Sequence, residues 1–156
     1  MRSGMEDSMT KDVLLAIKGI QFDASEAESN VQTITAAEYY EKNSSRYVIF
    51  EETEEGTDEK TKNIIKFKDN MMELTKRGFV NVHMLFEENK KNLTNYATPF
   101  GDVLIGIDAK KITLKEEEHK ISIDIDYALE ANYEFLADCK INVEISEKRQ
   151  PKACLS

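Results

Sequence analysis

Polar and apolar residues alternate along most of the chain, most clearly in its last third. Between residues 121 and 129 an Ile, Tyr or Leu occupies every second position, and most of the residues between them are polar. Residues 135–145 repeat this alternation, with Phe135 and Cys139 in the apolar phase. A period of two is typical of an antiparallel strand with one buried face. Ala131-Asn132 indicates a tight turn between the segments, so we predict a long terminal hairpin.

Shorter segments of the same kind predict further strands upstream. The expected strands cover residues 13–21, 31–41, 46–52, 60–68, 71–77, 80–86, 93–98 and 103–114. Residues that favour turns, such as Asp69-Asn70, separate them. Gly78 predicts a turn or bulge, Pro99 predicts a loop, and residues 115–120 are expected to form another loop.

This succession of short strands predicts an all-β fold. The expected architecture is an antiparallel up-and-down β-barrel of about 8–10 strands, and a β-sandwich is the alternative. The barrel is favoured because closure removes exposed strand edges. We expect one domain at residues 11–147, between disordered segments at residues 1–10 and 148–156.

The charge balance narrows the classes of partner. The chain has 21 basic and 30 acidic side chains, a net charge of -9. Binding to nucleic acid or to an anionic membrane surface requires a basic footprint, so neither is expected. An acidic surface mainly favours solubility. Residues 1–9 lack the apolar core of a secretory signal, and the apolar run at residues 13–17 is too short to span a bilayer, so a cytoplasmic location is expected.

No pattern of reactive side chains predicts catalysis, a metal site or a cofactor. Cys139 and Cys154 form neither a disulfide framework nor a zinc motif. His83 and His119 lack the surroundings of a nucleophile motif. Asp124 and Asp126 project from one face, but the simpler interpretation is the polar phase of a half-buried strand.

Arg77 offers the best candidate for a binding site. It precedes Gly78 at a predicted strand end, and Tyr96 approaches it if the strands pair in sequence order. An arginine among tyrosines at a barrel mouth can hold a carboxylate or phosphate head group. The alternative, which we favour, is an arginine that caps backbone carbonyls. The candidate ligand-binding residues are Tyr47, Arg77, His83 and Tyr96.

Several short motifs resemble the YwiB-like family of uncharacterised bacterial proteins. These motifs are Tyr39-Tyr40-Glu41-Lys42, Tyr47 to Phe50 followed by Glu51-Glu52, Thr61-Lys62, Arg77-x-Phe79 and Tyr96-Ala97-Thr98-Pro99-Phe100-Gly101. The resemblance covers residues 11–147 and is most specific at residues 96–101. It implies a lipocalin-like (calycin) barrel and a bacterial origin, and it transfers no activity. Phe50 and Ala37 depart from the family pattern, where tyrosine and glycine are common.

Two functional hypotheses follow. In the first, the barrel binds a small apolar or amphipathic ligand in its interior, because a barrel of this size can enclose one small ligand. In the second, the barrel is filled and acts as a non-enzymatic interaction or assembly module, whose acidic face docks a basic partner. A homo-oligomer is a further alternative. An enzyme is the third alternative, since carboxylates and tyrosines can form a site without any recognisable motif.

Overall fold

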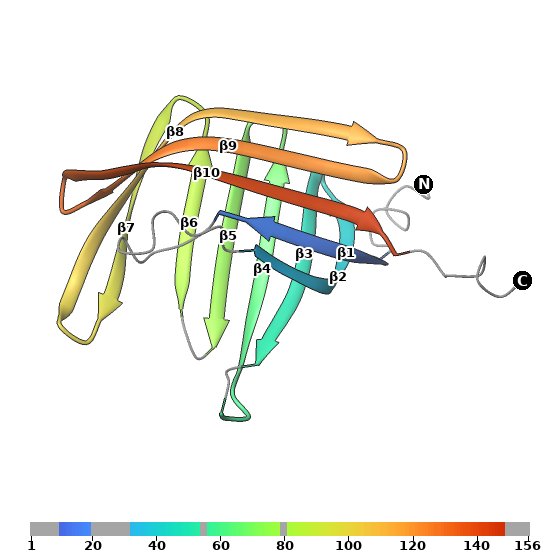
Figure 1. Cartoon of the computed structure of the whole chain (residues 1–156), viewed down its shortest axis with the longest axis horizontal. Coiled ribbons are helices and arrows are strands. Elements are labelled where there is room, and N and C mark those ends of the chain that lie inside the picture. The colour runs from blue at the N-terminus through green and yellow to red at the C-terminus, as the bar shows by residue number, and fades with distance from the viewer. Residues whose placement is uncertain (1–9, 20–31, 54–55, 79–80, 149–156) are drawn as a thin grey trace, which may run out of the picture.

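Ten antiparallel strands form a closed barrel in the computed structural model, which describes residues 10–19, 32–53, 56–78 and 81–148 (Figure 1). The strands are β1 (Thr10–Lys18), β2 (Gln32–Lys42), β3 (Ser45–Thr53), β4 (Lys60–Lys68), β5 (Met71–Gly78), β6 (Val82–Glu87), β7 (Lys90–Thr98), β8 (Gly101–Glu117), β9 (Lys120–Ala131) and β10 (Glu134–Glu147). Each strand lies beside its neighbours in sequence, and β1 closes the ring against β10. The predicted all-β, up-and-down barrel is confirmed. None of the described residues forms a helix long and apolar enough to cross a membrane.

Two predicted connections differ from those observed. The β9–β10 turn is Asn132-Tyr133 rather than Ala131-Asn132, and both of its residues have positive φ angles, 50° and 71°. The prediction of a loop at residues 115–120 is wrong. β8 continues to Glu117, so only two residues form the turn to β9. The segments expected to be disordered fall largely outside the described residues, although Thr10 already begins β1.

The barrel interior is filled by side chains from alternate strand positions. The largest fully buried ones are Phe67, Phe86, Leu15, Ile65, Met72, Leu74, Met84, Ile107, Ile123, Ile125, Ile141 and Val48. Phe135 does not join them, although its phase in the sequence predicted a core position. The β9–β10 register shifts between Phe135 and Ala137, so Phe135 lies on the outer face with 61% of its surface exposed. A bulge residue reverses the facing of the positions before it.

Two of the ten strand contacts are incomplete. β2 and β3 pair only between Glu38↔Ile49 and Lys42↔Ser45, and β6 and β7 pair only at Glu87↔Lys90. These pairs lie at the end of the barrel that carries the turns after β2, β4, β6 and β8, which we call the closed end. At the opposite end, which we call the open end, the β7–β8 hairpin diverges from β6 (Figure 1). Between β2 and β3 and between β6 and β7, the described part of the open end therefore has seams where neighbouring strands lack backbone pairing.

Large side chains and an ion pair occupy the closed end. Arg46 of β3 forms an ion pair with Glu116 of β8, and its guanidinium lies 5.7 Å from the Phe67 ring centroid. The rings of Phe86 and Tyr127 meet edge to face at 5.1 Å. Burial, with the Cys139 thiol beside it, raises the pKa of Tyr127. These contacts join β3–β6 to β8–β9 across the interior and leave the open end as the more accessible part.

Candidate functional site

A groove of about 440 Å³ lies along the β6–β7 seam at the open end, and we call it the seam groove. This volume is within the usual range for small-molecule sites. β5, β6 and β7 supply its walls, since β6 and β7 separate after a single backbone pair. The lining residues are Thr75, Lys76, Arg77, Asn81, Val82, His83, Thr94 and Asn95.

One side chain limits how far the seam extends toward the closed end. Asn92 of β7 donates through Nδ2 to the Leu85 carbonyl of β6 at 3.3 Å and to Glu87 Oε1 at 3.3 Å. The Leu85 carbonyl therefore faces β7. In an antiparallel strand the N–H and C=O groups of one residue point to the same side, and alternate residues share that side. The backbone groups of His83 consequently face the groove as well.

The groove presents one cation without a carboxylate partner among the described residues, together with several hydrogen-bond donors. Among the described residues, no aspartate or glutamate lines it. The Lys76 ammonium group is 3.0 Å from Glu52 Oε1, and His83 Nε2 is 2.5 Å from Glu73 Oε2. Arg77 is exposed and forms no ion pair with any residue that the structure describes. The guanidinium of Arg77 is thus the cation best placed to accept an anion from solvent.

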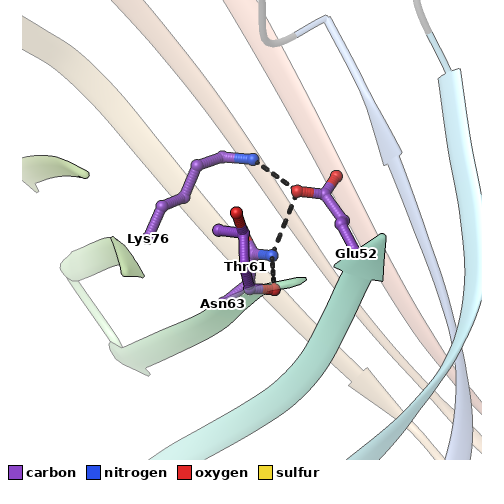
Figure 2. A network of polar contacts seen from close by, with 4 residues as sticks. All are labelled: Glu52, Thr61, Asn63 and Lys76. Atoms are coloured by element: carbon purple, nitrogen blue, oxygen red, sulfur yellow. Dashed lines mark hydrogen bonds and ion pairs between the residues drawn. The ribbon is translucent and has the colours of Figure 1, made fainter. Parts of the chain in front are cut away.

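A cluster of polar side chains lies beside the groove, and Lys76 belongs to both (Figure 2). We call it the inner cluster, and it consists of Glu52, Thr61, Asn63 and Lys76. Asn63 Nδ2 donates to Glu52 Oε1 at 3.2 Å and to the Thr61 carbonyl at 3.4 Å. Asn63 is 0% exposed, and its Oδ1 has no hydrogen-bond partner in the described part of the chain. A buried acceptor without a partner is costly, so a donor from a water molecule or a ligand is expected to complete it.

The four predicted site residues do not form one site. Arg77 and His83 both line the seam groove. Tyr96 is partly buried against the core, two residues beyond the groove residue Thr94 and on the same face of β7. Tyr47 lies elsewhere, on the outer surface near the closed end. Its ring stacks on Tyr40 with centroids 4.9 Å apart, and the Lys66 ammonium lies 5.9 Å from its centroid.

The sequence interpretation missed the inner cluster, although a signal for it was present. Residues 61, 63, 65 and 67 form the buried phase of β4, and the first two are Thr61 and Asn63. Polar residues in an otherwise apolar phase indicate buried hydrogen bonding or a binding site. Thr94 and Asn95 carried no comparable signal, since only the separation of β6 from β7 brings them to the groove.

Other candidate groups lack the geometry of a reactive centre. Asp124 accepts a hydrogen bond from Asn142 Nδ2 at 2.8 Å, and Asp126 lies 3.6 Å from the Lys140 ammonium group. Among the described residues, no group of three or more His, Cys, Asp or Glu side chains could hold a metal ion. Burial raises the pKa of the Cys139 thiol, which lowers its reactivity as a nucleophile.

Comparison with known proteins places the fold in a family. Residues 15–143 match the family model described as "Domain of unknown function (DUF1934)". The crystal structure of the ywiB protein from Bacillus subtilis superposes with a TM-score of 0.73 at 17% identity, covering 96% of this chain and 100% of that chain. No curated protein matches in sequence. The resemblance to YwiB-like proteins is confirmed, and the chain belongs to the DUF1934 family of β-barrel proteins.

Proposed function

We propose that this protein binds a small amphipathic anion at the open end of its barrel. The observation that carries the proposal is the seam groove, which combines Arg77, His83 and Lys76 with uncharged polar side chains. The proposal places the ligand at the mouth rather than in the centre, because large apolar side chains fill the centre.

Different residues of the groove would contact the anionic, polar and apolar parts of such a ligand. The guanidinium of Arg77 offers paired N–H donors that fit a carboxylate or phosphate. Asn81 and Asn95 add amide groups at the groove wall. Val82 lines the groove and supplies a small apolar surface, and the partly buried Tyr96 lies two residues beyond the groove residue Thr94. An anion with a short apolar chain would satisfy both kinds of surface.

The test is calorimetric titration with nonanoate, which pairs a carboxylate with a short alkyl chain. We expect the wild-type protein to bind it, and Arg77→Gln to weaken binding by about tenfold or more, since a hydrogen bond to a charged group contributes roughly 1.5–3 kcal/mol. Lys115→Gln removes an equal charge from an exposed position near the closed end and should change the affinity less than about twofold. Tyr47→Phe should also leave the affinity unchanged. Absence of binding to the wild-type protein would overturn the proposal.

A second candidate function is self-association, and exposed apolar side chains at two hairpins of the open end favour it. Phe100 is 98% exposed in the β7–β8 turn, while Tyr133 and Phe135 are exposed at the β9–β10 turn. The backbone N–H of Asn132 donates to the Leu104 carbonyl at 2.7 Å, which holds the second turn against β8. Tyr133 and Phe135 lie two residues apart, and neighbouring exposed apolar groups often mark interaction surfaces. Sedimentation velocity should then show a dimer that Phe135→Ser dissociates, and a monomer at all accessible concentrations would contradict this candidate.

A further inference from the structure

We infer that the inner cluster is a hydrogen-bond acceptor subsite, so the ligand carries a hydroxyl or amide N–H group distant from its anionic end. This inference rests on the proposed function and specifies the class of ligand. It starts from the contrast between the seam groove, which presents cations and donors, and the inner cluster, which presents unused acceptor capacity.

The acceptor is identified by the bonds that Asn63 already makes. Its Nδ2 donates to the Glu52 carboxylate, and this bond fixes which end of the amide is nitrogen, because a carboxylate only accepts. Oδ1 is then turned away from Glu52 and has no partner among the described residues. A ligand donor that reaches Oδ1 would remove the cost of a buried, unpaired acceptor.

Lys76 connects this acceptor to the groove. The residue lines the seam groove, and it is also the direct cross-strand neighbour of Asn63 on β4. On its other side Lys76 pairs with Val82 of β6, at the seam itself. The path from β6 to β4 crosses two strand spacings, or roughly 10 Å. Because Asn63 is 0% exposed, an extended molecule of this length reaches Oδ1 only when the Lys76 side chain moves aside, and its anion then lies beside the seam.

Glu52 indicates whether the ligand's donor group is neutral or charged. Its Oε1 accepts from both Lys76 and Asn63 (Figure 2). Since the Lys76 ammonium group already balances the Glu52 carboxylate, a second cation is not needed there. A neutral donor such as a hydroxyl or an amide N–H fits the cluster better than an ammonium group.

The experiment compares two isosteric probes by calorimetry, ω-hydroxyoctanoate and nonanoate, in which a methyl group replaces the hydroxyl. We expect the wild-type protein to prefer the hydroxylated probe by about tenfold, because the hydroxyl satisfies a buried acceptor. Asn63→Leu should abolish or reverse this preference while nonanoate still binds. Arg77→Gln should weaken both probes and keep their ratio.

The outcomes separate the two proposals. Equal affinities, or tighter binding of nonanoate by the wild-type protein, would overturn the acceptor subsite and leave the anion site standing. Failure of both probes to bind would overturn the proposed function and the subsite with it. The wild-type comparison decides the inference even if Asn63→Leu does not fold.

Discussion

The two ends of this barrel are built from the same ten strands but differ in backbone pairing and in the side chains that face inward. At the closed end, β2 pairs with β3 and β6 with β7, and Arg46, Phe67 and Phe86 fill the interior. At the open end, seams between these same strands interrupt the pairing, and Asn63, Lys76 and Glu52 face the mouth. One sheet can therefore bury the side chains that stabilise the fold at one end and hold accessible polar side chains at the other.

The largest expected effect comes from emptying the closed end. Phe67→Ala removes a fully buried ring that also contacts Arg46, so it should lower the free energy of unfolding by about 3–5 kcal/mol. Phe135→Ala makes the same truncation at an exposed site of the open end and should change stability by less than about 0.5 kcal/mol. Urea denaturation measures both. Similar losses for the two variants would contradict the assignment of stability to the closed end.

A smaller loss of stability is expected from substituting Gly78, the glycine that ends β5 at the open end. Gly78 ends β5 with a φ of 146°, and an added Cβ would lie 2.2 Å from the Lys60 carbonyl oxygen. Gly78→Ala should therefore cost roughly 1–3 kcal/mol, through backbone strain and displacement of β4. Gly56 has a φ of 86° with open space around it. Gly56→Ala separates the two causes, and an equal loss in both variants would show that contact with β4 adds nothing.

The smallest effect concerns the seam itself. Asn92→Ala removes the side chain that bonds the Leu85 carbonyl across β6 and β7, so it should cost about 0.5–1.5 kcal/mol. Amide exchange measured by NMR should accelerate at Glu87 and Lys90, which form the adjacent β6–β7 pair, more than at Met84, which faces β5. Asn95→Ala, on the same strand, is the control, because no side-chain bond of Asn95 to a described residue is lost. Uniform acceleration along β6 would indicate general destabilisation instead of local opening.

The sequence predicted the fold well because side-chain alternation reports local facing, and every strand pairs with its neighbours in sequence. It failed where one residue changes the phase. The bulge beside Phe135 turned a predicted core aromatic outward, and nothing in the residue types distinguishes that bulge from regular strand. Arg77 and His83 could be proposed as binding residues because charged and polar residue types are visible in sequence. Their shared groove could not, since it depends on where backbone pairing stops between β6 and β7.

The pairing of β1 with β10 also sets the order in which the chain can fold. All other strand pairs join consecutive segments, and those from β2 to β10 have short connections, so they can form as hairpins. Val13 pairs with Glu147, which requires closure over nearly the whole chain. Long-range closure costs conformational entropy before it gains contacts, so pairing that spans the chain slows folding. The ring is therefore expected to close late, after the meander from β2 to β10 has formed, and β1 is the strand whose docking completes the native state.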